Sequence, residues 1–216
     1  MFTLFLITFN LNSVSVQQLE KHVQKLNDDD NVHGIIVQLP FDSIEKIDQH
    51  HIVNMISPLK DVDGLTVINS GNLLHGKLGG SHSYQPCTPA GCIELIKKTG
   101  TPIAGARAVV LGRSQIVGSP MAQLLIWNHA TVTVCHSRTK NLPEVCREAD
   151  ILVVAIGQPL FVKKDWVKPG AVVIDCGISA IPDATKKSGQ RLVGDVDFDA
   201  VKEVAGFITP GKITLI

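Results

Sequence analysis

Apolar residues recur at helical spacing in the first part of the chain. Between residues 16 and 27 an apolar side chain returns every three or four positions, which predicts an amphipathic helix. Ser15 and Gln18 have the spacing of a capping box and mark its first turn. Residues 34–39 form a short β-branched run that predicts a buried strand, and residues 43–56 predict a second helix.

The middle of the chain has weaker periodicity. Residues 69–86 are rich in Gly, Ser and His, and we interpret them as a surface loop that connects two domains. Thr88 is predicted to cap the next helix, with Pro89 at its first position and Gly100 at its end.

From residue 108 onward, short apolar runs are separated by helical or loop segments. Runs that are apolar throughout are typical of strands buried on both faces, and their alternation with helices is typical of a parallel sheet. The sequence therefore predicts an α/β fold with a doubly wound parallel sheet. The predicted strands are residues 108–111, 130–134, 151–155 and 171–175, and the predicted helices are residues 120–128 and 142–149.

The composition of the chain limits which kinds of partner it is expected to bind. The 216 residues are 44% hydrophobic, so the chain can bury a core, and global disorder is excluded. Twenty basic and twenty acidic residues cancel, which predicts no nucleic-acid or membrane partner but leaves room for one basic pocket that binds a small anion. The scattered cysteines indicate neither a disulfide framework nor a metal site; several are interpreted as core residues of a reducing compartment. They are Cys87, Cys92, Cys135, Cys146 and Cys176.

A glycine-containing turn lies between the predicted strand 108–111 and the next helix. It holds Gly112, Ser114 and Gly118, at the place where a doubly wound fold binds phosphate on a helix N-terminus. The glycines do not follow the G-x-G-x-x-G pattern, so an ordinary strand-to-helix turn is the alternative interpretation.

Nearby polar residues favour NADP over NAD as the dinucleotide. The second predicted strand runs into Cys-His-Ser-Arg, without the carboxylate that binds a ribose 2′-hydroxyl in NAD sites. Ser137 can donate a hydrogen bond to a phosphate, and Arg113 supplies a guanidinium that matches phosphate geometry. Arg138 is interpreted either as a second such group or as a solvated loop charge.

Two polar residues follow apolar segments in the first part of the chain. Gln38 ends the run 34–39, and Asp63 lies in Lys-Asp-Val-Asp-Gly. An amide beside a carboxylate can bind the donor and acceptor edge of a heterocycle. The alternative interpretation is that Asp61 and Asp63 only cap a glycine-ended turn.

Six short motifs in this order resemble the methylenetetrahydrofolate dehydrogenase/cyclohydrolase family, over roughly residues 16–210. They are Val37-Gln-Leu-Pro40, Lys60-Asp-Val-Asp-Gly64, Pro86-Cys-Thr-Pro89, Gly112-Arg-Ser-x-x-Val-Gly118, Gly194-Asp-Val-Asp197 and Ile208-Thr-Pro210.

The resemblance implies two domains: an α/β folate-binding catalytic domain over residues 1–86 and a Rossmann-type NADP domain over residues 87–210. It implies oxidation of 5,10-methylenetetrahydrofolate with NADP, then hydrolysis of the methenyl product to 10-formyltetrahydrofolate. It also implies a homodimer formed through the NADP domains. We expect a cytoplasmic location and leave a mitochondrial one open.

The resemblance also assigns roles to single residues. Gln38 and Asp63 match catalytic-site positions, and Val37 and Leu39 flank Gln38 in the substrate site. The residues that match the cofactor site are Gly112, Arg113, Ser114, Ser137 and Ile178.

The sequence departs from the family pattern at both ends. The family has a Tyr-x-x-x-Lys motif before the glutamine, whereas the single tyrosine here is Tyr84, and no Gly-rich loop follows Thr209-Pro210. We therefore interpret the chain as truncated at both ends, with an incomplete folate domain, a fragmentary apolar start and impaired cyclohydrolase chemistry. The alternatives are a catalytically silent NADP-binding or dimerising fragment, and a different two-domain NADP dehydrogenase.

Overall fold

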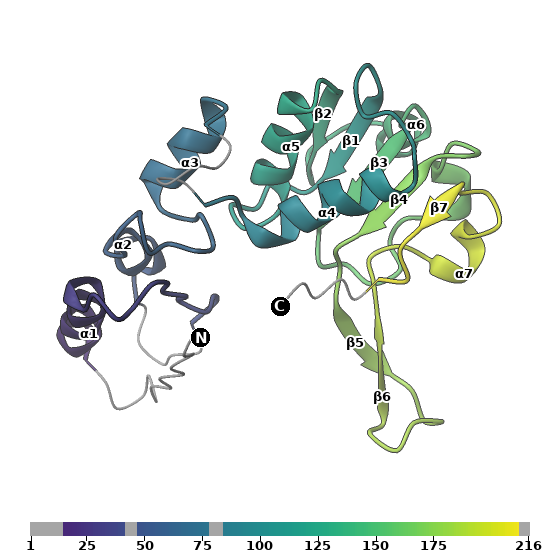
Figure 1. Ribbon diagram of the computed structural model, residues 1–216. Helices are drawn as coiled ribbons and strands as arrows, with labels where there is room; N and C mark the ends of the chain where they lie inside the picture. The colour runs from purple at the N-terminus through teal and green to yellow at the C-terminus, as the bar shows by residue number, and fades with distance from the viewer. Residues whose placement is uncertain (1–14, 42–46, 78–83, 212–216) are drawn as a thin grey trace. The chain divides into compact units, whose positions relative to one another are not determined.

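The structure is a computed structural model that describes residues 15–41, 47–77 and 84–211 (Figure 1). The chain divides into two compact units, residues 1–85 and 86–216, and each is described by itself. The apolar start of the chain lies outside the described residues, as do parts of the predicted helix 43–56 and of the predicted loop 69–86.

The described part of the first unit is built mainly from helices. The predicted capping box is confirmed: the backbone N–H of Gln18 donates to Ser15 Oγ at 3.3 Å, and Gln18 Oε1 accepts from the backbone N–H of Ser15 at 2.9 Å. The helices are α1 (Val16–Asp28), α2 (Gln49–Asn54) and α3 (Val67–Leu74). A small core joins α1 and α2 to the segment before Gln38, with the buried residues Leu19, Val23, Ile35, Ile47, Ile52 and Ile56.

The predicted strand over residues 34–39 is wrong. Only Ile35 makes a strand-like bridge, to Asp61, with its backbone N–H donating to the Lys60 carbonyl at 2.7 Å. The neighbouring Ile36 is 58% exposed. No described segment forms a ladder of hydrogen bonds along this run, so its β-branched composition does not produce a strand.

One helix prediction and one loop prediction in this unit are also corrected. In the described part of residues 43–56, the helix covers only Gln49–Asn54, because the Asp48 carboxylate accepts the N–H groups of its first turn. The predicted loop 69–86 instead begins inside α3, which Thr66 caps by accepting the backbone N–H of Asn69 at 3.3 Å. A threonine cap and one apolar turn outweigh the Gly and Ser content there.

The second unit contains the predicted parallel sheet. Its strand order is β2-β1-β3-β4-β7, and all four neighbouring pairs are parallel. Strands β3 and β4 are buried at every position, as the apolar runs 151–154 and 172–174 predict, and β4 ends with the buried Asp175. The strands are β1 (Arg107–Leu111), β2 (Thr131–Cys135), β3 (Ile151–Val154), β4 (Val172–Asp175) and β7 (Phe207–Ile208).

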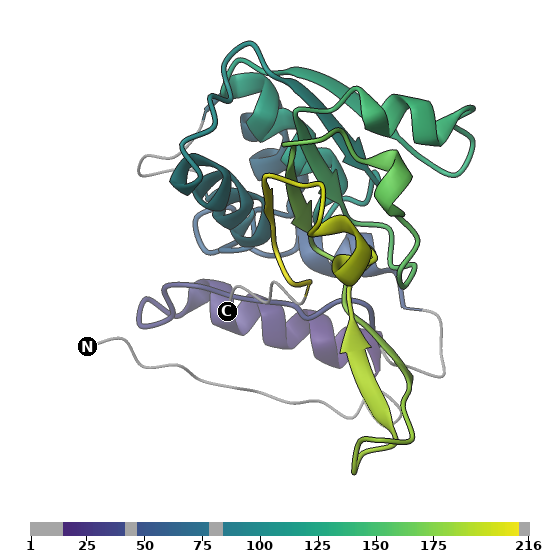
Figure 2. The same ribbon diagram turned by 90° about the vertical axis from the view of Figure 1, so that its right-hand side faces the viewer.

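Helices cover the sheet on both sides (Figure 2). The start of α4 differs from the prediction: Pro86 takes the N-cap position, and Thr88 lies inside the helix. Gly100 follows its end with φ +77°, as predicted. The helices are α4 (Cys87–Lys98), α5 (Gly118–Trp127), α6 (Leu142–Arg147), the 3₁₀ helix η1 (Lys164–Trp166) and α7 (Phe198–Val201). An antiparallel hairpin of β5 (Ser179–Pro182) and β6 (Gln190–Val193) projects away from the sheet (Figure 1).

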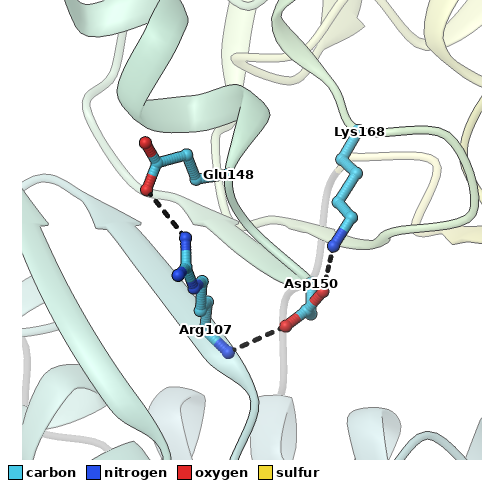
Figure 3. Close-up of polar contacts among 4 residues, drawn as sticks. All are labelled: Arg107, Glu148, Asp150 and Lys168. Atoms are coloured by element: carbon cyan, nitrogen blue, oxygen red, sulfur yellow. Dashed lines mark hydrogen bonds and ion pairs between the residues drawn. The ribbon is translucent and has the colours of Figure 1, made fainter.

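Ion pairs hold the edge of the sheet where β1 and β3 begin (Figure 3). The backbone N–H of Arg107 donates to Asp150 Oδ2 at 2.9 Å, and its guanidinium donates to Glu148 at 3.1 Å. Lys168 Nζ lies 2.6 Å from Asp150 Oδ1, and this hydrogen bond lowers the pKa of Asp150. At the opposite end of the sheet, where the parallel strands end, Arg113 follows β1 and Ser137 follows β2.

Among the described helices, none is both long enough and apolar enough to cross a bilayer.

Candidate functional site

In the turn between β1 and α5, the backbone lies in close contact with neighbouring backbone at two glycines. Gly112 has φ +112°, and a Cβ at this position would overlap the carbonyl oxygen of Ala155, which follows β3. A Cβ at Gly118 would overlap the carbonyl oxygen of Gly112. Both positions therefore require glycine, and the turn can approach a ligand closely at the end of the strands.

Ser114 closes this turn. Its hydroxyl oxygen accepts the backbone N–H groups of Val117 at 3.2 Å and Gly118 at 3.3 Å, and its carbonyl accepts the N–H of Ser119 at 2.9 Å. These three backbone N–H groups are therefore already paired within the turn. The Ser114 O–H remains a donor because both bonds to its oxygen are accepted ones.

Arg113 and Ser137 lie at the same edge of the sheet. Leu111 pairs with Cys135 in the parallel register, and the N–H of Gly112 donates to the Cys135 carbonyl at 2.9 Å. Arg113 and Ser137 each follow that pair by two residues, and both are exposed. A guanidinium and a hydroxyl beside a glycine turn are the groups that bind a phosphate.

Two buried carboxylates organise the loops that follow β3 and β4. Asp175 accepts the N–H groups of Gly177 at 2.8 Å, Asp195 at 3.0 Å and Val196 at 2.9 Å. Burial raises the pKa of Asp175, while these three bonds act to lower it. The Asp195 carboxylate in turn accepts the N–H groups of Ile156 at 2.8 Å and Gly157 at 2.9 Å.

This network places Ile178, which directly follows Gly177 and is 46% exposed. Glycine is required beside the carboxylates, since a Cβ at Gly177 would overlap Asp195 and a Cβ at Gly194 would overlap Asp175. Sequence reasoning gave Asp175 and Asp195 no role. Their signal was present: a carboxylate at the end of a wholly apolar run, and a second one after Gly194.

In the first unit, Asp61 is a structural residue. It is 1% exposed and accepts the N–H of Thr66 at 2.8 Å, the N–H of Leu65 at 3.2 Å and the side-chain amide of Asn69 at 2.9 Å. The turn-capping interpretation is therefore correct for Asp61. Lys60 has a structural role as well, because its ammonium donates to three carbonyl oxygens at the end of α1.

Asp63 is half-buried and lines a small pocket together with Val37. Burial raises the pKa of Asp63, and the charge of Asp61 raises it further. The side chain of Gln38 is exposed and donates weakly to the Leu39 carbonyl at 3.4 Å. The structure thus brings Val37 and Asp63 to one pocket, whereas Gln38 and Leu39 lie on the segment next to it and do not line it.

Among the described residues, no group of His, Cys, Asp or Glu side chains is arranged to hold a metal ion. The polar groups present are instead an exposed guanidinium and hydroxyl at the carboxyl ends of β1 and β2, and in the first unit a half-buried carboxylate that lines a small pocket. A doubly wound sheet with a glycine turn at its carboxyl edge defines a dinucleotide-binding class of protein.

The sequence assigns the chain to a family within that class. Residues 86–214 match the family model of the tetrahydrofolate dehydrogenase/cyclohydrolase NAD(P)-binding domain, and residues 3–63 match that of the catalytic domain. The chain therefore belongs to the tetrahydrofolate dehydrogenase/cyclohydrolase family.

Similar proteins carry names of this family. The cytoplasmic C-1-tetrahydrofolate synthase of Spodoptera frugiperda is 58% identical over 91% of the chain, and the bifunctional protein FolD of Listeria innocua is 55% identical over 92%. The crystal structure of Trypanosoma brucei methylenetetrahydrofolate dehydrogenase-cyclohydrolase, complexed with NADP cofactor and inhibitor, has a TM-score of 0.84 at 42% identity and covers 92% of the chain. The chain spans 21% of the synthase and 66% of each of the other two.

Proposed function

We propose that the chain oxidises 5,10-methylenetetrahydrofolate to 5,10-methenyltetrahydrofolate with NADP⁺, as part of one-carbon folate metabolism. The observation that carries the proposal is the strand edge at Leu111 and Cys135, where a glycine turn, Arg113 and Ser137 lie together in a chain of this family. NADP⁺, when bound there, supplies the hydride acceptor.

The cofactor-side residues fit the extra phosphate of NADP. The Arg113 guanidinium and the Ser137 hydroxyl, both exposed, would bind the 2′-phosphate, and the Ser114 hydroxyl would donate to a phosphate oxygen. Gly112 fits because its lack of a side chain leaves the turn open to close approach. Ile178 would provide an apolar contact for the nicotinamide ribose on the loop that Asp175 holds.

The substrate-side residues fit a pterin ring. The Asp63 carboxylate would accept hydrogen bonds from the ring amino and N–H groups, and the Gln38 amide can donate and accept at the reacting end. Val37 and Leu39 would supply apolar contacts on either side of Gln38. Binding of a ring donor to Asp63 would favour its charged form and oppose the effect of burial on its pKa.

Hydride transfer is the principal activity that these residues support. The dehydrogenase step needs alignment of two ring carbons more than proton transfer. Hydrolysis of the methenyl bridge needs a positioned water and a group that moves a proton. Of the four proposed substrate-side residues only Asp63 is ionisable, so we propose that cyclohydrolase activity is weak in this chain.

A reaction assay tests the proposal. Purified protein is mixed with 5,10-methylenetetrahydrofolate and NADP⁺, and the absorbance of the methenyl product is followed. We expect product formation with NADP⁺, a lower rate with NAD⁺, and strong loss of rate in Asp63→Ala. No product above the enzyme-free control would contradict catalysis. NADP⁺ binding without turnover would support the alternative, a silent NADP-binding fragment.

We also propose that the chain is a homodimer through the second unit. Strand β2 is at an edge of the sheet, and apolar residues beside it are exposed: Val134 (40%), Ile126 (44%) and Trp127 (41%). An apolar edge strand is typically covered by a partner. Light scattering after size exclusion would show twice the monomer mass, and Val134→Lys would shift it to the monomer. A monomeric wild-type chain would contradict the proposal. Nucleic acid and membranes are not among the proposed partners, and the cytoplasm is the proposed location.

A further inference from the structure

Two cysteines far apart in the sequence meet between α4 and the loop after β4. Cys92 lies inside α4 and is fully buried, whereas Cys176 directly follows β4 and is partly exposed. Their sulfur atoms are 3.5 Å apart, although 84 residues separate them along the chain. Among the described residues this is the one pair of cysteines in sulfur–sulfur contact.

The geometry allows these sulfurs to bond. A disulfide needs an S–S distance of about 2.05 Å, so the two side chains must approach by about 1.5 Å. Side-chain rotations together with a small shift of the loop after β4 supply such a movement. An oxidant from solution reaches the pair past the partly exposed Cys176, and the two sulfurs lie so close that one can resolve the other once it is oxidised.

The hydrogen bond between the two thiols shifts their pKa values in opposite directions. It lowers the pKa of Cys92 and raises that of Cys176. Burial and the nearby carboxylates of Asp175 and Asp195 raise the pKa of Cys176 further. Oxidation therefore accelerates with rising pH, because a thiolate is the species that attacks the oxidant.

We propose that Cys92 and Cys176 form an oxidisable dithiol, and that its disulfide form binds NADP more weakly than its reduced form. The oxidant class is a peroxide. Hydrogen peroxide takes two electrons from the sulfurs: one S–S bond forms, two S–H bonds break, and the peroxide is reduced to two water molecules.

The effect on NADP rests on the function proposed above. Cys176 lies between Asp175, which holds the loop, and Gly177–Ile178, which is the proposed nicotinamide contact. A disulfide would draw this loop toward α4 and disturb the bond from the Gly177 N–H to Asp175. Disulfide formation would thereby displace the proposed nicotinamide contact, which lies in the same unit.

Peptide mapping tests the dithiol itself. The reduced full chain is treated with hydrogen peroxide, alkylated, digested and analysed by mass spectrometry. We expect a linked pair of peptides containing Cys92 and Cys176, formed faster at higher pH. Cys87→Ser, which removes an exposed cysteine from the same helix, should leave the link intact, and Cys176→Ser and Cys176→Ala should both abolish it. A folded, peroxide-treated protein without this link, or one linked through other cysteines, would overturn the proposal.

Titration with NADP⁺ tests the consequence. In the wild type and in Cys87→Ser we expect a loss of affinity of about tenfold on oxidation, restored by dithiothreitol, and no such change in Cys176→Ser. Formation of the link with unchanged affinity would overturn the proposed effect on binding. If the reduced protein does not bind NADP⁺ at all, the proposed function fails instead, while the mapping still decides whether the dithiol exists.

Discussion

Asp175 and Asp195 are joined by a hydrogen bond from the backbone of one to the side chain of the other: the Asp195 N–H donates to Asp175 Oδ1 at 3.0 Å. The Asp195 carboxylate then continues the chain of contacts to the backbone of Ile156 and Gly157. The loops that follow β3 and β4 are therefore held by two carboxylates that solvent barely reaches. The position of Ile178, one of the proposed cofactor contacts, depends on this network.

The first prediction concerns Asp175→Asn. The amide can keep one oxygen for Gly177 and Asp195, but its NH₂ group would face the N–H of Val196, which now donates to Oδ2 at 2.9 Å. We expect the free energy of unfolding to fall by about 1.5–3 kcal/mol, the value of a buried hydrogen bond to a charged group. Urea unfolding measures the change. Asp199→Asn, which alters an exposed carboxylate, is the matched control and should stay within about 0.5 kcal/mol of wild type. Equal effects of the two substitutions would contradict the anchoring role.

The second prediction separates crowding from backbone strain. Gly112 and Gly100 both have positive φ, but only at Gly112 would a Cβ meet neighbouring atoms. We expect Gly100→Ala to lower the free energy of unfolding by about 1–2 kcal/mol, from the left-handed backbone alone. Gly112→Ala should cost about 3 kcal/mol or more, because the overlap with the Ala155 carbonyl adds to the strain. Thermal or urea unfolding compares them, and a similar cost at both positions would show that the turn does not pack as described.

The third prediction is a pH dependence of stability. Burial raises the pKa of Asp63 in the folded chain above its value in the unfolded chain. Within the interval between the two values the folded state binds more protons, so the contribution of Asp63 to the free energy of unfolding falls as pH rises. Asp63→Asn removes this dependence.

We therefore expect Asp63→Asn to gain stability relative to wild type as the pH rises above about 4, the usual pKa of an aspartate. Urea unfolding at several pH values measures the gain. Asp30→Asn, in an exposed turn, is the control. A stability difference between Asp63→Asn and wild type that shrinks toward neutral pH would contradict the burial effect.

The parallel sheet was predictable because its strands obey a simple rule. The run at β3 is apolar at every position, the run at β4 is apolar up to Asp175, and both strands are buried at every position. The same rule failed at residues 34–39, where only Ile35 finds a backbone partner among the described residues. A short apolar run does not show whether a neighbouring strand exists, and for this reason the rule succeeds at β3 and β4 but fails at residues 34–39.

The candidate site was predictable only in part. Gly112, Arg113 and Ser137 could be found because they follow predicted strands directly. Asp175 and Asp195 carry a sequence signal, but it does not identify their partners, because most of these are backbone amides about 20 to 40 residues away along the chain. The contact of Cys92 with Cys176 depends on how α4 packs near β4, which no local pattern encodes.

The fourth prediction concerns dinucleotide selectivity. Arg113 and Arg107 flank opposite ends of β1, and Arg107 is engaged with Glu148 (Figure 3). We expect Arg113→Ala to weaken NADP⁺ binding by about 10- to 100-fold, because a charge-assisted hydrogen bond to phosphate contributes about 1.5–3 kcal/mol. NAD⁺ binding should change little. Arg107→Ala, which removes a charge from the other end of the strand, should leave both affinities unchanged. Isothermal titration with both dinucleotides measures these values, and equal losses for NADP⁺ and NAD⁺ would contradict a contact with the 2′-phosphate.

The most direct test of the cofactor site is a crystal structure of the chain with NADP⁺ at saturating concentration. The account predicts that the dinucleotide lies across the ends of β1 and β2, with its 2′-phosphate in contact with the Arg113 guanidinium and the Ser137 hydroxyl. A dinucleotide bound elsewhere on the chain, or no bound dinucleotide at that concentration, would contradict it.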